Sequence, residues 1–181
     1  AGTVGYALPD VSVRIADEEG REVPHGEVGT IEVRGPNVFK GYWDMPEETA
    51  RSFRPDGYFI TGDLGVMEPD GRVSIVGRGK DLIISGGLNV YPKEVEIELD
   101  AMDGVTESAV IGVPHPDFGE SVVAVVTGSP PPEPEMIARL SERLARFKVP
   151  KRIFTVPELP RNVMGKVQKA ELRQRFADTF R

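Results

Sequence analysis

A chain of 181 residues with no cysteine and a net charge of −7 excludes disulfides, thiolate metal sites and thiol catalysis. Its two histidines, His25 and His115, lie too far apart in the sequence to suggest a metal cluster, so we expect no metal site. The composition, 39% hydrophobic and 28% charged, is that of a globular protein. Since no apolar run could span a membrane and no export signal opens the chain, we expect a cytoplasmic protein without a membrane partner.

The first eighty residues are expected to be rich in strands. Apolar and polar residues alternate in 11–15 and 30–34, and Pro-Asp-Gly turns occur at 55–57 and 69–71. Short strands at this spacing predict a small barrel or meander. One helix is expected at 46–53, where a proline and two glutamates form the first turn.

After Asp81, strands and helices alternate. Strands are expected at 82–84, 109–113, 122–126 and 153–156. Helices are expected over 92–102, over 136–147 and from Gln168 onward, and a surface loop over the proline-rich residues 129–134. Long βαβ spacing is absent, so this part is predicted to be a small α+β domain. A boundary near 79–81 gives two domains, 1–80 and 81–181.

The charge is unevenly distributed. It amounts to −5 over residues 1–80, −9 over 81–145 and +7 over 146–181. A basic segment in an acidic chain indicates an anionic ligand, or else a solvated basic helix. Nucleic acid is disfavoured because aromatic residues do not alternate with the basic ones, as they do on a base-stacking surface. A small phosphorylated ligand fits better.

Two polar residues in the first eighty are candidates for nucleotide contacts. Asp63 follows Tyr-Phe-Ile-Thr-Gly and is expected just after a strand, where a carboxylate could accept two hydrogen bonds from a ribose diol. Arg78 lies between two glycines, and its guanidinium could pair with a phosphate or a ribose. Taken singly, the first is equally an ordinary turn and the second a charged hairpin tip.

Two further stretches combine glycine with possible ligand contacts. Gly86 and Gly87 leave room for a thin ligand to pass the backbone, or form a plain turn. Lys166 follows Gly165 on an expected exposed loop. Its ammonium could neutralise the charge that builds up where a carboxylate meets a phosphate, or it is one more surface lysine.

In their order and spacing, four segments resemble the C-terminal part of the adenylate-forming enzymes. This superfamily comprises acyl-CoA synthetases, peptide-synthetase adenylation domains and luciferases. Residues 26–42 are similar to its GE-x-G…GY segment, and residues 58–64 to its Y-x-x-TGD element. Residues 77–96 are similar to its GR-x-x-D…GG-x-N-x-x-P-x-E-(V/I)-E hinge segment, and 160–169 to P-x-x-x-x-GK-x-x-(K/R). The resemblance covers essentially the whole chain.

The resemblance implies two half-reactions. A carboxylate attacks the α-phosphate of Mg·ATP to give an acyl-adenylate and pyrophosphate, and the thiol of CoA then displaces AMP. Asp63 would bind the ribose hydroxyls, and Arg78 would contact the ribose and phosphate region. Asp81 would be the hinge of the mobile C-terminal domain, and Gly86 and Gly87 would line the pantetheine tunnel. Lys166 would bridge the substrate carboxylate and the α-phosphate during adenylation only.

The chain lacks the family's phosphate loop and its aromatic-Gly-x-Thr-Glu segment, which would precede Ala1 together with most of the acyl pocket. Residues 1–80 are therefore expected to be the incomplete end of a large N-terminal adenylation domain, with Mg²⁺ bound mainly by the part before them. Residues 81–181 are expected to be the complete mobile domain. We expect this chain alone to have no ligase activity.

The segments 35–43, 87–95 and 159–166 most resemble bacterial malonyl-CoA synthetases, although medium-chain and aryl acyl-CoA ligases share much of this sequence. A peptide-synthetase adenylation domain is an alternative that a carrier domain after Arg181 would favour. The non-enzyme alternative is an interaction module whose docking loop is formed by Pro130, Pro131, Pro132 and Pro134. In some members of the family the lysine matching Lys166 is reversibly acetylated, which implies a protein acetyltransferase as a possible partner.

Overall fold

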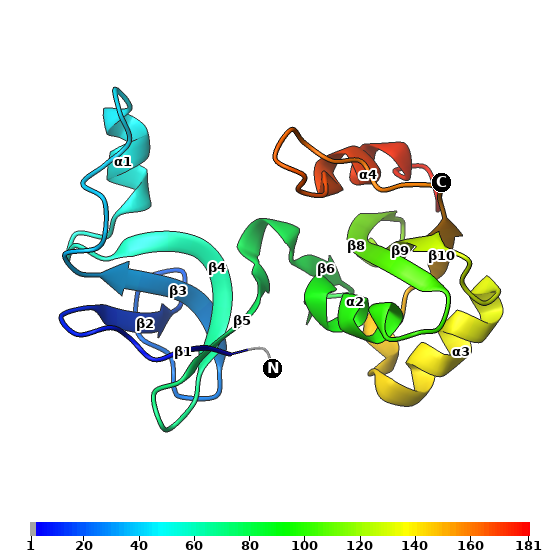
Figure 1. Cartoon of the computed structure of the whole chain (residues 1–181), viewed down its shortest axis with the longest axis horizontal. Coiled ribbons are helices and arrows are strands. Elements are labelled where there is room, and N and C mark those ends of the chain that lie inside the picture. The colour runs from blue at the N-terminus through cyan, green and yellow to red at the C-terminus, as the bar shows by residue number, and fades with distance from the viewer. Residues whose placement is uncertain (1–2) are drawn as a thin grey trace. The chain divides into compact units, whose positions relative to one another are not determined.

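The computed structural model describes residues 3–181 and separates into two compact units (Figure 1). The first ends at Lys80, and the second comprises Asp81–Arg181. Both combine strands with helices, which confirms the predicted α+β class. Within residues 3–181, no helix is long and apolar enough to cross a membrane.

The first unit is built on a five-stranded antiparallel sheet. Its strands are β1 (Thr3–Gly5), β2 (Ser12–Ala16), β3 (Val28–Arg34), β4 (Phe59–Met67) and β5 (Val73–Arg78). Strands β2 to β5 form a meander, and β1 pairs with the other side of β5. The alternating segments supply the core, since Ile15 and Ile31 pack with Val73 while their polar neighbours face the opposite side of the sheet.

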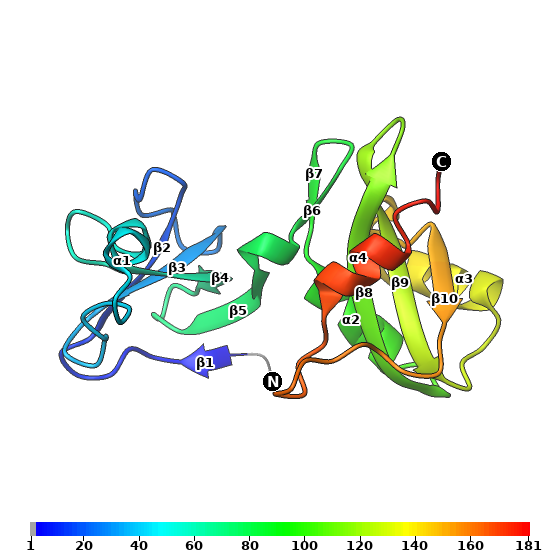
Figure 2. The same ribbon diagram turned by 90° about the horizontal axis from the view of Figure 1, so that it is seen from above.

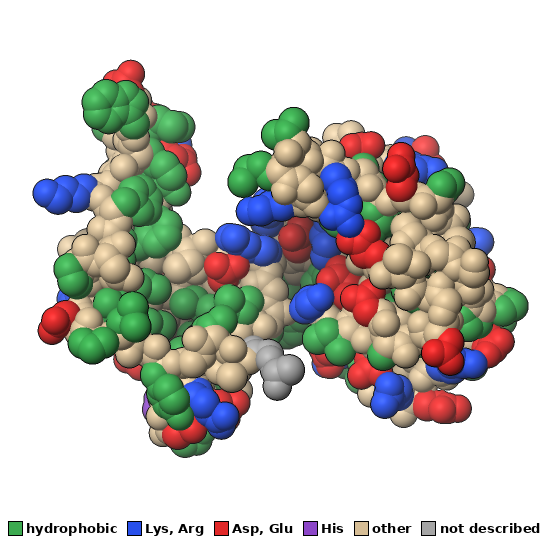
Figure 3. Space-filling model, in the orientation of Figure 1, with side chains coloured by type: hydrophobic (Ala, Val, Ile, Leu, Met, Phe, Trp, Pro, Cys, Tyr) green, Lys and Arg blue, Asp and Glu red, His purple; other side chains and the backbone are tan. Residues whose placement is uncertain are grey.

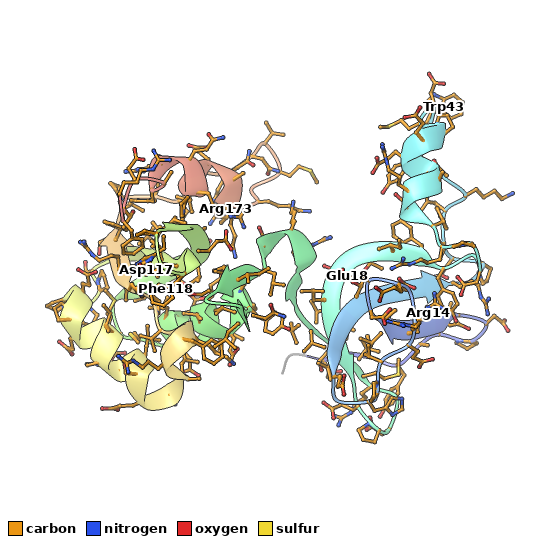
Figure 4. The ribbon with its side chains drawn as sticks, turned by 180° about the vertical axis from the view of Figure 1, so that it is seen from behind. Arg14, Glu18, Trp43, Asp117, Phe118 and Arg173 are labelled. Carbon is orange, nitrogen blue, oxygen red and sulfur yellow. The ribbon has the colours of Figure 1, made fainter. Side chains whose placement is uncertain are left out.

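The helix α1 (Pro46–Ser52) interrupts the meander between β3 and β4, as its first turn predicted. Three aromatic rings, those of Phe39, Phe53 and Phe59, join its two flanking segments with centroids 5.1–5.8 Å apart. Trp43 precedes the helix, is 96% exposed and lies at the tip of this segment (Figure 4). The aromatic cluster therefore secures α1 to the sheet, whereas Trp43 adds nothing to the core of this unit.

A fully buried carboxylate, Glu32, ties the outer strands of the sheet to the segment before β4. It pairs with Arg14 on β2 at 2.7 Å and with Arg54 at 2.8 Å. Arg14 also pairs with Asp56 at 2.7 Å, and its guanidinium lies 3.9 Å from the centre of the Tyr58 ring (Figure 4). A buried carboxylate is tolerated only when its charge is compensated, and two guanidinium groups do so here.

Asp56→Asn is expected to lower the free energy of unfolding at neutral pH and to make it less sensitive to acidification. The hydrogen bond donated by the Arg14 guanidinium lowers the pKa of the Asp56 carboxyl below its ordinary value. A carboxyl whose pKa is lowered by folding stabilises the folded state above its ordinary pKa of about 3.9. That contribution is lost as the pH falls through the lower, folded-state pKa.

Urea unfolding at about pH 7 and about pH 3 measures this effect. The difference in unfolding free energy between the wild type and Asp56→Asn should shrink on acidification. Glu158→Gln, at an exposed carboxylate of the second unit, is the control. A difference for Asp56→Asn that is the same at both pH values would contradict the assignment.

The second unit has a sheet of five strands and three α-helices. The strands are β6 (Ile83–Ser85), β7 (Leu88–Val90), β8 (Val105–His115), β9 (Gly119–Gly128) and β10 (Arg152–Thr155). The helices are α2 (Pro92–Asp100), α3 (Glu133–Arg143) and α4 (Lys169–Arg175). The long hairpin of β8 and β9 is the centre of the unit, and β6 extends the sheet from the start of β9.

Three expectations for this unit need correction. β10 runs parallel to β9, so β9, α3 and β10 form a βαβ unit that the spacing did not indicate. α3 ends at Arg143 and not at Phe147, since Leu144 is extended and residues 146–148 form a separate 3₁₀ turn. Finally, the loop over 129–134 is shorter than predicted: Pro132 caps α3, and Pro134 lies in its first turn, where a missing N–H costs no hydrogen bond.

Helices cover both faces of the β8–β9 hairpin (Figure 2). Alternate residues, such as Val110 and Ala124, pack on one side against Leu99 of α2 and Leu140 of α3. The residues between them pack on the other side against Leu172 of α4, which is fully buried. Burying such a leucine contributes about 1.5–3 kcal/mol, so the seven-residue α4 is held by packing more than by its own helix propensity.

Candidate functional site

Asp63 and Arg78 lie opposite each other on neighbouring strands. They are register partners on β4 and β5, and the Arg78 guanidinium contacts the Asp63 carboxylate at 2.9 Å. The prediction that Asp63 follows a strand is therefore wrong, because Asp63 lies within β4. The pair is partly exposed, since the Asp63 side chain retains 24% of its accessible surface and that of Arg78 53%. Its remaining oxygen and N–H groups can bind a ligand carrying hydroxyls and an anion.

Asp81, the predicted hinge residue, is the last residue of a short 3₁₀ turn, Gly79–Asp81. Its carboxylate contacts the guanidinium of Arg173 at 2.7 Å. Arg173 belongs to α4, at the other end of the second unit's sequence (Figure 4). The first residue of this unit is thereby fixed to its last helix.

Gly86 and Gly87 form the tight turn between β6 and β7. Both have positive φ, +58° and +79°, which disfavours any residue with a side chain. The Gly86 N–H donates to the Phe118 carbonyl at 3.0 Å, and a Cβ added at Gly86 would come within 3.3 Å of the Phe118 ring. The bend predicted from sequence is present, and it lies directly beside an aromatic side chain.

An open cavity of about 1070 Å³ adjoins this turn. It is bordered by the β6–β7 turn, the start of β9 and the segment between α3 and β10. Its lining residues include Gly86, Leu88, Phe118, Phe147 and Lys151. Such a combination of apolar walls and a few charged groups is typical of small-molecule sites.

Basic groups give this cavity a preference for anions. The Lys151 ammonium lies 3.7 Å from the centre of the Phe118 ring, and Arg146 also lines the cavity. Ser121 borders the cavity too, and its hydroxyl is a buried side-chain group without a hydrogen-bond partner among residues 3–181. The cavity thus offers aromatic surface and positive charge to a ligand, while the Ser121 hydroxyl stays buried in its wall.

Lys166 is exposed on a loop whose backbone is closely tied together. The Asn162 side-chain oxygen accepts the N–H groups of Met164 and Lys166 at 3.0 and 2.9 Å. The Arg161 guanidinium donates to the Gly165 carbonyl, and Gly165 has a φ of +77°. Within the described part of the chain, Lys166 forms no ion pair. The loop therefore presents a free ammonium group on an ordered backbone.

The candidate residues fall into separate groups. Asp63 and Arg78 contact each other in the first unit, while Asp81, the two glycines and Lys166 belong to the second. No sequence motif pointed to Phe118, Phe147 or Lys151 as site residues. Two of these, Phe147 and Lys151, lie in the basic segment assigned to an anionic ligand, so the charge count gave a signal without locating the cavity.

Over residues 3–181, no three His, Asp or Glu side chains come close enough together to hold a metal ion. This finding concerns residues 3–181 only, and the absence of a metal site stays a prediction. A magnesium ion that accompanies ATP would need ligands from the triphosphate and from residues that are not part of 3–181.

Two stretches of the chain match family models. The model of the AMP-binding enzyme C-terminal domain matches residues 94–166, and that of the AMP-binding enzymes matches residues 1–43. A feruloyl-CoA synthase from Amycolatopsis sp. is 47% identical over 178 residues, which are 97% of this chain and 36% of that protein.

Two solved structures are also similar. ATP-bound MatB from Rhodopseudomonas palustris is 58% identical with a TM-score of 0.93, over 99% of this chain and 37% of that one. The o-succinylbenzoate-CoA synthetase MenE from Bacillus subtilis, bound to its acyl-adenylate intermediate, is 35% identical with a TM-score of 0.90. That match covers 95% of this chain and 35% of MenE. The chain thus spans about a third of the length of these relatives.

Proposed function

Because the chain belongs to the AMP-binding enzyme family and corresponds to the C-terminal part of its acyl-CoA ligases, we propose that the full-length protein is an AMP-forming acid–CoA ligase. The observation that carries the proposal is the exposed Lys166 on its ordered loop. A fixed positive charge can stabilise the negative charge that accumulates when a carboxylate attacks a phosphate. Lysine suits this task because its ammonium is a compact point charge on a flexible stem.

The first half-reaction joins the acid to ATP. A carboxylate oxygen bonds to the α-phosphorus, and pyrophosphate leaves with the electrons of the broken P–O bond. In this proposal Lys166 contacts the carboxylate and the α-phosphate, Asp63 accepts hydrogen bonds from the ribose hydroxyls, and Arg78 contacts the ribose and phosphate region. The second unit then turns about Asp81, so that Lys166 is withdrawn after adenylation.

The second half-reaction transfers the acyl group to CoA. The thiol gives up its proton, its sulfur bonds to the acyl carbon, and AMP leaves with the electrons of the broken C–O bond. The cavity beside Gly86 supports a role in binding CoA, because its aromatic walls suit a purine and its basic groups suit phosphates. The pantetheine arm would pass the exposed Gly86–Gly87 turn, where the absence of side chains leaves room.

Malonate is the acid we propose first, because the chain is 58% identical to MatB, which is a malonyl-CoA synthetase. An aryl acid is the second candidate, since the feruloyl-CoA synthase is 47% identical. The acyl pocket itself is expected upstream of this chain. A basic side chain there that could hold a second carboxylate would favour malonate.

An acid panel tests the proposal. The full-length protein is incubated with ATP, Mg²⁺, CoA and malonate, ferulate or medium-chain acids, and AMP and the thioester are measured. Thioester from malonate supports the first candidate, and thioester from ferulate the second. If none of these acids gives AMP, the ligase proposal is contradicted. The 181-residue chain alone serves as a control and should give no thioester.

Lys151→Met is expected to raise the KM for CoA by about tenfold, since it removes a charge-assisted phosphate contact from the cavity. Adenylate formation, measured as pyrophosphate release without CoA, should stay unchanged. Arg139→Met is the matched control, because it removes a cation of the same unit whose partner Glu135 is on its own helix. An unchanged KM for CoA, or an equal loss of pyrophosphate release, would rule out this use of the cavity.

A further inference from the structure

Glu96 and Lys169 each end a segment that resembles a motif of the family. Neither motif indicated that the two residues contact each other. Glu96 ends the segment 77–96, and Lys169 ends the segment 160–169. In the structure the two side chains form an ion pair, with 2.5 Å between the lysine Nζ and Oε1 of the glutamate. The pair joins α2 to the start of α4 across 73 residues of sequence.

The carboxylate of Glu96 is part of the core of the second unit. Its side chain is only 9% exposed, and Oε1 also accepts the Val110 N–H of β8 at 3.0 Å. The Lys169 side chain, 19% exposed, supplies the positive charge that this buried carboxylate requires. One carboxylate thus holds together α2, β8 and the first turn of α4.

Lys169 lies three residues after Lys166, so its anchor fixes one end of the lysine-bearing loop. Between them, the Gln168 N–H donates to the Pro160 carbonyl at 2.8 Å, and Val167 forms a β-bridge with Arg161. These backbone contacts tie the end of the loop near Lys169 to its beginning at Pro160 and Arg161. Figure 3 shows acidic and basic side chains interspersed on the side of this unit that carries α2 and α4.

A second ion pair anchors the other end, but it is weaker on physical grounds. The Arg161 guanidinium contacts the carboxylate of Glu107 on β8, and these side chains are 45% and 35% exposed. Solvent screens such a pair, whereas a buried pair keeps most of its attraction and is costly to break on one side only. Of the two anchors, Lys169–Glu96 is the one expected to set the position of the loop.

We propose that Glu96 and Lys169 are positioning residues that hold the loop so that the Lys166 ammonium stands where the acid and ATP react. This inference rests on the proposed function, since it assumes that Lys166 acts in adenylation. The geometry matters because a displacement of about 1 Å of a catalytic group can slow a reaction by about a hundredfold.

The test compares the two half-reactions in full-length variants. Lys169→Met is expected to slow adenylate formation by about 10- to 100-fold while leaving thioester formation from supplied acyl-adenylate within about twofold. Lys169→Arg keeps the charge and should restore most of the adenylation rate. Arg143→Met is the matched control, because it breaks a 2.7 Å ion pair with Glu98 on the same helix α2 but away from the loop.

A double variant separates positioning from stability. Glu96→Gln with Lys169→Met removes both buried charges, so the melting temperature should return toward that of the wild type while adenylation stays slow. Hydrogen exchange should show faster exchange at Met164 and Lys166, confined to residues 160–169. If the double variant regains the adenylation rate, or if Lys169→Met slows both half-reactions equally, the pair is only structural.

Lys166→Ala in the same assays shows which proposal has failed. If it leaves adenylation unchanged, the proposed function of Lys166 is wrong. If it suppresses adenylation while Lys169→Met and the double variant do not, the function stands and the positioning role alone is wrong.

Discussion

In the full-length protein, Lys166→Ala is expected to lower the rate of acyl-adenylate formation by about 10²- to 10³-fold. The structure places this ammonium on an exposed loop whose backbone is fixed by Asn162 and Arg161. Its charge can therefore meet a developing anion with little reorganisation. Because thioester formation from supplied acyl-adenylate passes through no pentavalent phosphate, that half-reaction should keep most of its rate.

Pyrophosphate release with acid and ATP measures the first half-reaction, and thioester appearance from acyl-adenylate and CoA measures the second. Lys93→Ala, at an exposed lysine of α2, is the control for loss of a surface charge. An equal loss in both half-reactions would mean that Lys166 supports folding or general binding and not adenylation. Protein acetylation at this exposed lysine would remove the same charge, so the acetylated protein should behave like the alanine variant.

Patterns with a short range were predictable from the sequence. The alternation at 30–34 places Ile31 in the core because successive side chains of a strand face opposite sides. Likewise, Val95 and Leu99 are buried on one face of α2 because residues four apart lie above one another on a helix. The end of α3 was not predictable in this way, since Leu144 continues the apolar spacing while its backbone is already extended.

The contacts that build the sites link residues far apart in the sequence, so no local pattern contains them. The cavity is assembled from the turn at Gly86, the start of β9 and the segment before β10. Asp81 pairs with Arg173 across 92 residues. The sequence gives the charge of each residue, but only the parallel addition of β10 and the packing of α4 bring these charges together.

Asp63→Asn is expected to impair both half-reactions, in contrast to Lys166→Ala. The ribose is present in ATP and again in the acyl-adenylate, so a carboxylate that accepts its hydroxyls is used throughout. The substitution replaces a charged acceptor by a neutral amide and also weakens the 2.9 Å contact with Arg78. Hydrogen bonds to charged groups contribute about 1.5–3 kcal/mol, which corresponds to about a 10- to 150-fold loss in kcat/KM for ATP.

A suitable control exists on the adjoining turn of the same sheet. Asp70, on the turn between β4 and β5, pairs with Arg72 at 2.9 Å, so Asp70→Asn removes an Asp–Arg ion pair from the same sheet. This carboxylate is more exposed than that of Asp63, 48% against 24%, and its partner is two residues away on the same turn. It should leave both half-reactions unchanged, which separates loss of a ribose contact from loss of sheet stability. If Asp63→Asn instead slows only one half-reaction, the nucleotide is held differently in the two steps, and the assignment of Asp63 to the ribose is wrong. A KM for ATP equal to that of the wild type would exclude the contact altogether, because no binding energy would then have been lost with the carboxylate.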